Sequence, residues 1–385
     1  MRLTRDAQTV VDTVTMLGGH ALLVGGFVRD QALGIESKDI DIEVHGLVDP
    51  EALVRHLEIR GKVDSVGVAF GVIKFGHDVD VSFPRRDSKV GDGHKGFSIE
   101  VDHTMTVEEA LKRRDLTINS MAMDPVTGEI IDPFGGQMDL LTHTIRHTSD
   151  STFADDPLRV LRAVQFASRF KFTVAPKTAA LARGMVDQFE HLSVERVWVE
   201  WEKILTKGQS MQAVCEALID TGWIEHFPEW GVSGRVTDRV IRALKMPASP
   251  RRATLTLATQ FAGRTDSLET FLKRIDAPGW LRRDALKLAS RHEEFTSGDP
   301  AVRARQISRA LGCIPLADWV ACHRLDGTPI SRQAECLAPL LTGDDLIDLG
   351  WKPSKEFGVT LKAALACQDI EGWTTKEEAL AWLTL

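Results

Sequence analysis

The pattern of hydrophobic and polar positions changes about 150 residues into the chain. Before that point, short apolar runs of the strand type alternate with segments of helical period. The runs cover residues 21–24, 40–44, 70–75 and 79–83. Beyond about residue 150 the period is helical nearly throughout. The pattern predicts an α+β fold in which an α/β head over residues 1–140 precedes a long helical part.

Composition excludes several classes of protein. The 385 residues are 43% hydrophobic and 26% charged, as in an ordinary globular chain, and the net charge of -8 argues against a heavily basic binder. No apolar run approaches the roughly 20 residues of a membrane span, and the N-terminus carries charges where a secretory signal would be apolar. We therefore expect a cytoplasmic protein without a membrane partner.

Cysteine and tyrosine usage narrows the chemistry further. The five cysteines include no CxxC pair, so neither a zinc knuckle nor a disulfide framework is expected. Tyrosine is absent, so any stacking on a nucleic-acid base would have to come from Phe, Trp, His or Arg.

Basic residues are concentrated in the helical part despite the acidic total. The segment 235–252 contains six Lys or Arg residues and one acid, and further basic clusters occupy 282–291 and 303–309. A solvated helix face explains such clusters, and so does contact with a nucleic-acid backbone. The sequence alone leaves both explanations open.

The first chemical motif is a pair of glycines directly after the run 21–24. Gly25 and Gly26 would let the backbone approach a phosphate, and the short helix expected after them would carry Arg29. Turns use glycine pairs constantly, so this motif is weak by itself.

Carboxylates on neighbouring strands strengthen the motif. Asp39 and Asp41 alternate with isoleucines and so lie on one face, and Asp80 can join them from the strand at 79–83. Clustered carboxylates repel one another and favour a divalent ion with oxygen ligands, although a polar edge strand gives the same alternation. Three acids beside a phosphate-binding turn predict a nucleotidyl transferase that uses two metal ions.

With these motifs the chain resembles the class II tRNA nucleotidyltransferases, the CCA-adding family, whose head is shared with bacterial poly(A) polymerases. The resemblance depends on the order of six motifs between residues 20 and 205. They are GGFVRD (25–30), DID (39–41), RRDLTINSM (113–121), DPFGG (132–136), DDPLRVLRA (155–163) and ERVWVE (195–200).

The resemblance implies an organisation and a set of roles. It implies a polymerase-beta-like nucleotidyltransferase head over 1–140, a helical neck with a base-selecting motif over 141–205, and a helical RNA-binding body and tail over 206–385. Asp39 and Asp41 would bind Mg²⁺, with Asp80 as a third catalytic carboxylate. The nucleotide would be bound by Gly25, Gly26, Arg29, Arg114, Asp156, Arg159 and Arg162.

The chemistry of base selection supports part of this assignment. Asp156 is expected to cap a helix and to share a face with Arg159, three residues later. A carboxylate accepts from an amino group and a guanidinium donates to a ring nitrogen or carbonyl, a polarity that fits cytosine and adenine and rejects uracil and guanine. An ordinary surface ion pair would have the same spacing.

Two positions depart from the family pattern. Asp155 stands where glutamate is common, and Gln165 stands where many members carry another arginine. The second change is expected to remove one positive charge from the nucleotide site.

The implied activity is addition of C, C and A from CTP and ATP to the 3′ end of tRNA without a template, with release of pyrophosphate. A-adding, CC-adding and poly(A)-adding relatives share the motifs and stay open as alternatives. A non-catalytic RNA-binding protein on a degenerate head is the alternative of a different class, and the intact Asp39, Asp41 and Asp80 argue against it.

Overall fold

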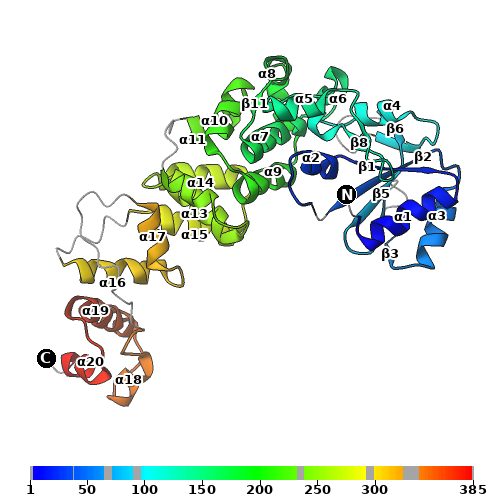
Figure 1. Ribbon diagram of the computed structural model, residues 1–385. Helices are drawn as coiled ribbons and strands as arrows, with labels where there is room; N and C mark the ends of the chain where they lie inside the picture. Colours follow the sequence, from blue (N-terminus) through cyan, green and yellow to red (C-terminus); the bar gives the residue numbers. More distant parts are fainter. Residues whose placement is uncertain are drawn as a thin grey trace. The chain divides into compact units, whose positions relative to one another are not determined.

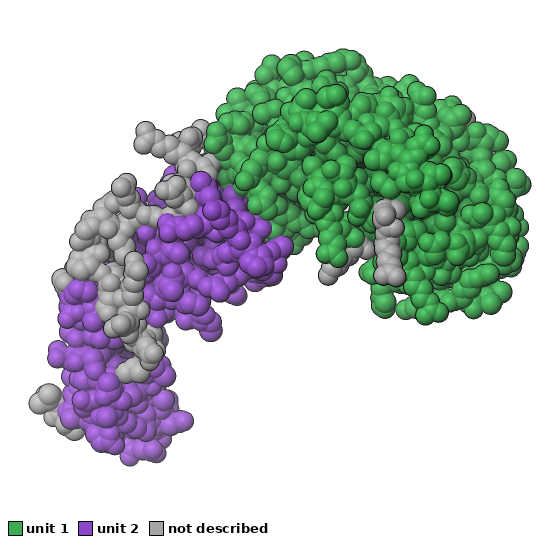
Figure 2. Space-filling model, in the orientation of Figure 1, with its two compact units in different colours: residues 1–235 green, residues 236–385 purple. Residues whose placement is uncertain are grey.

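The chain forms two compact units, Met1–Arg235 and Val236–Leu385 (Figure 2). The computed structural model describes residues 3–37, 39–64, 72–89, 97–231, 238–291, 299–323 and 338–383. The first unit includes residues 206–235, which the sequence analysis placed in the body. The three-part division into head, neck and body stays a prediction.

A seven-stranded mixed sheet forms the centre of the head (Figure 1). Across the sheet the strands are β3 (Val63–Asp64), β4 (Val72–Phe75), β5 (Val79–Ser82), β2 (Ile40–His45), β1 (His20–Val24), β8 (Ala122–Met123) and β9 (Ile130–Ile131). β2 and β5 are parallel, and the other neighbours are antiparallel. The strands predicted at 21–24, 40–44 and 79–83 are confirmed. The run at 70–75 becomes β4, and its first two residues lie outside the described ones.

Helices cover both faces of this sheet. β1 is central, and Ala21–Val24 are at most 3% exposed. Helix α1 (Arg5–Met16) packs on β1 and β2, and α3 (Pro50–Glu58) packs on α1. On the opposite face, Leu111 of α4 (Val107–Lys112) joins a buried cluster with Leu22 and Val24. This second face is the one that carries the predicted site.

The glycine-rich segment 85–102 is not simply the loop that its composition suggests. Its two arms pair as an antiparallel hairpin, β6 (Arg85–Lys89) and β7 (Phe97–Val101). The alternation of Phe97, Ile99 and Val101 with polar residues is a strand signal that the glycine content obscured. Residues 90–96 between the arms lie outside the described ones.

The remainder of the first unit is largely helical. It contains η2 (Thr117–Asn119), α5 (Gly136–Leu141), α6 (Asp150–Ala154), α7 (Leu158–Phe170), α8 (Pro176–Arg183), η3 (Val186–His191), α9 (Val194–Lys207), α10 (Met211–Asp220), η4 (Trp223–His226) and α11 (Pro228–Gly231). The expectation of an all-helical neck is wrong in one detail, because β10 (Thr144–Ile145) and β11 (Thr173–Val174) form a short parallel pair. Lys171 reverses the chain in the left-handed region, at φ 59°, and so brings β11 beside β10.

Aromatic side chains form the core of this helical region. Trp201 of α9 stacks on Trp230, with ring centres 5.1 Å apart, and meets Phe227 edge-on at 5.0 Å. Phe189 packs against Phe227 and Trp223. These contacts hold α9 beside η4 and α11, and α7 packs against α9 and α10.

The second unit is helical throughout its described residues. Its helices are α12 (Asp238–Leu244), α13 (Pro250–Gln260), α14 (Thr265–Arg274), α15 (Gly279–Ala289), α16 (Pro300–Leu311), α17 (Leu316–Cys322), α18 (Gly343–Asp348), α19 (Lys355–Glu371) and α20 (Lys376–Leu383). No helix among the described residues is long and apolar enough to cross a membrane.

Several basic residues of this unit have structural partners. Arg251 forms a two-pronged ion pair with Asp318, and Arg309 forms another with Asp369. Arg252 is 3% exposed and donates to the carbonyl of Met246. These three arginines therefore stabilise helix packing, so the basic clusters of the sequence are not simply an open surface for a polyanion.

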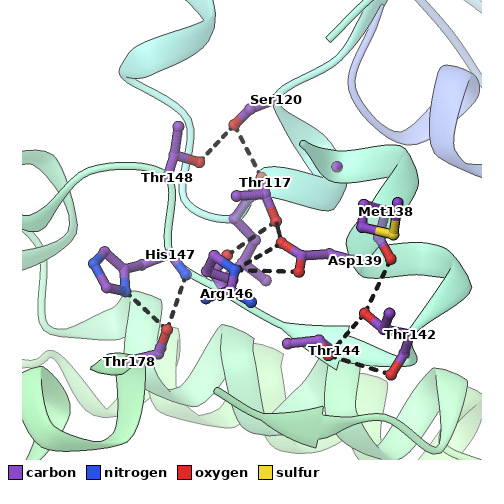
Figure 3. A network of polar contacts seen from close by, with 12 residues as sticks. Thr117, Ser120, Met138, Asp139, Thr142, Thr144, Arg146, His147, Thr148 and Thr178 are labelled. Atoms are coloured by element: carbon purple, nitrogen blue, oxygen red, sulfur yellow. Dashed lines mark hydrogen bonds and ion pairs between the residues drawn. The ribbon is translucent and has the colours of Figure 1, made fainter. Parts of the chain in front are cut away.

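A polar network joins α5, η2 and β10 within the first unit (Figure 3). Asp139 is 4% exposed, and its carboxylate accepts from Thr117 Oγ1 at 2.7 Å and from Arg146 Nε at 3.1 Å. His147, next to Arg146, contacts Thr178 of α8 through both its backbone N–H and its ring. The network ties the end of the head to the first helices after it.

Replacing Asp139 by alanine is expected to loosen this junction. Thr117 and Arg146 would lose their buried acceptor, which costs about 1–3 kcal/mol of local stability. Hydrogen exchange of peptides covering 115–120 and 144–150 should become faster, while peptides from α13 in the second unit should be unaffected. Asp155→Ala, at an exposed acid, is the matched control. Equal exchange in both variants would contradict a stabilising role for the network.

Candidate active site

The structure places Asp41 and Asp80 side by side. They are register partners on the parallel strands β2 and β5, whose backbones lie about 4.8 Å apart, and both side chains therefore leave the same face of the sheet. Asp39 is exposed, lies one residue before β2, and precedes Asp41 by the two residues that return a chain to the same face. The three predicted carboxylates thus share one region.

The electrostatics of Asp41 show that these charges interact. Burial raises the pKa of Asp41, and the nearby charges of Asp80 and Asp39 raise it further. Arg114 and Arg29 oppose the shift without cancelling it. Lys74 pairs with Asp80 at 3.2 Å, but the Lys74 side chain is largely exposed and Asp80 is only partly buried, so this pair compensates little.

The acidic region fits a hard cation held by few protein ligands. Among the described residues no group of three or more His, Cys, Asp or Glu side chains is arranged to hold a metal ion. Magnesium, however, is commonly bound by one or two carboxylates and completes its shell with water and substrate phosphates. Two repelling, partly buried carboxylates on adjacent strands provide such a donor set.

The turn between β1 and α2 (Gly26–Ala32) is shaped by Arg114. Gly25 has φ 67° and ψ −126°, a conformation that side chains disfavour. A Cβ on Gly25 would lie 2.5 Å from Nη1 of Arg114 and 3.7 Å from Oδ2 of Asp41. The glycine is required because the guanidinium occupies this space, and Arg114 consequently lies directly above the turn.

Arg29 is more deeply buried than a simple ligand of an anion would be. It is 4% exposed, donates from Nε to Asp30 at 2.8 Å and donates from Nη1 to Asn119 at 2.5 Å. Its guanidinium carbon lies 5.0 Å from the ring centre of Phe166 and 5.1 Å from that of Phe170. Burial lowers the pKa of Arg29, and Asp30 acts against that effect. Arg29 therefore positions α2 against α7 and presents its edge to the site.

The residues predicted to select the base, Asp156, Arg159 and Arg162, lie at the start of α7. The helix begins at Leu158, and Asp156 accepts from the Leu158 N–H at 3.1 Å, so its capping role agrees with the sequence. Its ion-pair partner is Arg196 of α9, at 2.7 Å, rather than Arg159. Nη1 of Arg159 is buried without a hydrogen-bond partner among the described residues. Arg159 can therefore still donate a hydrogen bond from Nη1.

Arg162, one turn later, is held in place by the head. Its Nε donates to Asp115 at 2.6 Å, and Nη1 lies 3.9 Å from Glu200. Burial alone would lower the pKa of Arg162, but Asp115 and Glu200 outweigh it and raise the pKa. Burial likewise acts to raise the pKa of Asp115, but Arg162 and Asn119 hold it below its ordinary value.

One cavity of about 550 Å³ brings these groups together. Its lining includes eight of the ten predicted site residues: Gly25, Gly26, Arg29, Asp41, Arg114, Asp156, Arg159 and Arg162. Asp39 and Asp80 lie outside the lining, on the acidic side next to Asp41. The remaining lining residues are Asp115, Asn119, Leu158, Phe166 and Arg196.

Three polar lining residues, one aromatic lining residue and Glu200, which lies beside Arg162, were not predicted as site residues. All but one lie within the quoted motifs: Asp115 and Asn119 in RRDLTINSM and Arg196 in ERVWVE. Phe166 follows DDPLRVLRA by three residues, and Glu200 ends ERVWVE. Their position in or beside the ordered motifs could have indicated that these residues belong to the site. Only the fold shows that Arg196 pairs with Asp156.

Family models match two segments of the chain. The poly A polymerase head domain matches residues 21–146, and the model described as the probable RNA and SrmB-binding site of polymerase A matches residues 171–231. Residues 21–146 are thus similar to poly A polymerase head domains. The resemblance seen in the motifs is confirmed, and both Asp41 and Asp80 lie inside this matched segment.

Several proteins named multifunctional CCA protein are similar to this chain in sequence. The chain is 41% identical to that of Cupriavidus metallidurans over 226 residues, which are 55% of this chain and 53% of the relative. It is 38% identical to that of Dechloromonas aromatica over 259 residues, which are 64% of this chain and 61% of the relative. The chain thus spans little more than half the length of these curated relatives.

Solved structures match the fold over nearly the full chain. The Bacillus stearothermophilus CCA-adding enzyme in complex with CTP has a TM-score of 0.67 and 25% identity, and the match covers 99% of this chain and 98% of that one. The Thermotoga maritima CCA-adding enzyme complexed with tRNA has a TM-score of 0.64 and 22% identity, with 99% and 97% covered. These matches confirm the predicted fold class: an α/β head domain followed by a largely helical remainder.

The geometry of the head domain predicts that Gly25→Ala weakens anion binding. The new Cβ would displace Arg114, so the dissociation constant for inorganic tripolyphosphate, measured by calorimetry, should rise about tenfold. Gly34→Ala is the matched control, because Gly34 has φ +68° but no atom within 4 Å of the added Cβ. Equal binding by the two variants would show that Arg114 does not contribute to the anion site.

Proposed function

We propose that the protein is a template-independent tRNA nucleotidyltransferase that adds C, C and A from CTP and ATP to the 3′ end of tRNA. The observation that carries this proposal is the single cavity that gathers all seven predicted nucleotide ligands and Asp41. The CTP and ATP complexes of CCA-adding enzymes with this fold support the choice of nucleotides. In each cycle the RNA 3′ oxygen bonds to the α-phosphorus, the bond to pyrophosphate breaks, and the hydroxyl proton is lost.

The acidic side of the cavity would hold Mg²⁺. Asp39 and Asp41 are the proposed ligands, and Asp80 is the third carboxylate beside them. When bound, the ions neutralise the triphosphate and favour an ionised 3′ oxygen. The contribution of the chain is to hold the carboxylates at one face of the sheet and to limit the access of water to Asp41, which is partly buried.

The basic side would hold the triphosphate and the base. Arg114 lies above the glycine turn, where backbone groups can approach phosphate oxygens, and Arg29 fixes that turn against α7. Arg159 offers its unpartnered Nη1 as a donor to a ring nitrogen or carbonyl. Asp156 is two-thirds buried and accepts from Arg196 and Leu158, and a carboxylate has lone pairs for a further amino donor.

In this proposal the nucleotide is selected by hydrogen-bond donors and acceptors on fixed side chains rather than by a template. Arg196 restrains Asp156, so the carboxylate that would accept from the base is oriented before the base arrives. Asp115 likewise restrains Arg162, which lies three residues after Arg159 on α7. Cytosine and adenine each present an amine beside an unprotonated ring nitrogen, and this edge matches the pair Asp156 and Arg159. Uracil and guanine present the reverse polarity.

Transfer RNA is the proposed partner. Residues 171–231 match a family model described as a probable RNA-binding site, and the fold matches a CCA-adding enzyme complexed with tRNA. Residues 206–385 are proposed as the RNA-contacting body and tail. Arg251, Arg252 and Arg309 have internal partners, so other basic residues of the clusters are better candidates for phosphate contacts.

The decisive assay uses two tRNA substrates, one ending before CC and one ending after CC. The protein should extend the first by CCA with CTP and ATP and the second by A alone, and it should reject UTP and GTP. Asp39→Ala combined with Asp41→Ala should abolish both reactions, whereas Glu58→Gln on the exposed side of α3 should not. Extension of the second substrate alone would replace the proposal with an A-adding enzyme, and unchanged extension by the double variant would refute the carboxylate assignment.

Substitution of Asp156 by asparagine should relax nucleotide choice. The amide can donate as well as accept, so discrimination of C and A against U and G should fall by about 1–3 kcal/mol, or roughly tenfold to a hundredfold. The measurement is incorporation of each of the four nucleotides in single turnovers. Asp155→Asn is the control, because Asp155 is exposed and does not line the cavity. Unchanged discrimination in Asp156→Asn would remove Asp156 from base selection.

A further inference from the structure

A buried carboxylate that neither the motifs nor the proposed function uses lies next to the acidic site. Glu43 is 8% exposed and follows Asp41 by two residues on β2. Its register partner on β1 is Leu22, which packs towards α4, so Glu43 lies on the same face as Asp41. A buried carboxylate destabilises a fold unless it is paired, so its partners show what holds it there.

The two oxygens of Glu43 have different partners. Oε1 lies 3.0 Å from Nε2 of His45, which is also buried. Oε2 lies 3.7 Å from Nη2 of Arg114. Both oxygens of the buried Glu43 carboxylate therefore have a partner, and Arg114 is the cation that it faces.

Arg114 lies within reach of two carboxylates but pairs with one. Its Nη1 and Oδ2 of Asp41 both lie close to the position of a Cβ on Gly25, at 2.5 Å and 3.7 Å. Among the described residues, its ion pair is nonetheless with Glu43 and not with Asp41. A guanidinium released from Glu43 would have the partly buried Asp41 within reach, and a carboxylate paired with arginine is a poor ligand for a cation.

We propose that Glu43 is a positioning residue that holds Arg114 away from Asp41, so that Asp41 stays available to a divalent cation while Arg114 stays directed at the phosphate site. The inference deepens the proposed function and rests on its assignment of Asp41 as a metal ligand. Glu43 itself contacts neither the cation nor the nucleotide. Its role is to pair with Arg114, so that Arg114 does not neutralise Asp41 instead.

The test measures Mn²⁺ binding to the full-length, nucleotide-free protein by electron paramagnetic resonance. Glu43→Gln keeps the size of the side chain and a group that can face His45, but it removes the charge that holds Arg114. We expect the dissociation constant for Mn²⁺ to rise about tenfold. Glu58→Gln, which removes an exposed acid from α3, controls for the change in net charge and should leave binding unaltered.

A double variant separates positioning from a purely structural role. If Arg114 forms an ion pair with Asp41 when the charge of Glu43 is removed, then Glu43→Gln combined with Arg114→Gln should bind Mn²⁺ at least as tightly as the wild type. Distortion of β2 would instead leave the double variant as weak as Glu43→Gln. Glu43→Asp keeps the charge on a shorter side chain and should give intermediate binding, which preserves a test if Glu43→Gln folds poorly.

The outcomes distinguish this inference from the proposed function. If Asp41→Asn weakens Mn²⁺ binding and Glu43→Gln does not, the positioning role is overturned and the metal assignment stands. If Asp41→Asn has no effect, the metal assignment itself fails, and the inference fails with it. Weak binding by Glu43→Gln that is restored in the double variant supports both.

Discussion

The proposed nucleotide cavity depends on two arginines, the buried Arg29 and the partly buried Arg162, which join elements far apart in the sequence. Arg29 extends from α2 to the aromatic face of α7, and Arg162 extends from α7 to Asp115 at the end of α4. Isolated buried charges are strongly destabilising, but each of these is paired and stacks on Phe166. These contacts fix the position of the glycine turn relative to the start of α7. Both segments lie in the first unit, and it is the need to compensate the charges of the two arginines that holds them together.

This arrangement divides the arginines of the site into two groups. Arg29 and Arg162 are committed to protein partners, and Arg196 is committed to Asp156. Arg114 and Arg159 can still donate further hydrogen bonds: Arg114 forms one ion pair, at 3.7 Å, and the buried Nη1 of Arg159 has no hydrogen-bond partner among the described residues. The committed arginines give the cavity its shape, and the other two give it affinity for an anion and for a polar base edge.

Local periodicity was sufficient to predict β1, β2, β4 and β5 and the shared face of Asp41 and Asp80, because alternation along a strand does not depend on distant residues. The hairpin at 85–101 was missed because glycine, lysine and histidine between its arms dominate the local composition. Pairings that join distant segments, such as Asp156 with Arg196 or Arg251 with Asp318, carry no local signal. The prediction therefore named eight residues that line one cavity in the structure, but it did not find the pairing of Asp156 with Arg196 or the internal partners of Arg251, Arg252 and Arg309.

The departure at Gln165 shows how the fold changes the meaning of a substitution. From the sequence alone, a glutamine in place of arginine takes a positive charge out of the nucleotide site. Gln165 is 2% exposed and does not line the cavity, because it lies three residues after Arg162 on a helix whose cavity-facing positions are 158, 159, 162 and 166. Five arginines line that cavity against three aspartates, so the excess of positive charge is already present. An arginine at 165 would have to bury its charge in the packing between α7 and its neighbours, and glutamine avoids that cost while leaving the charges around the nucleotide unchanged.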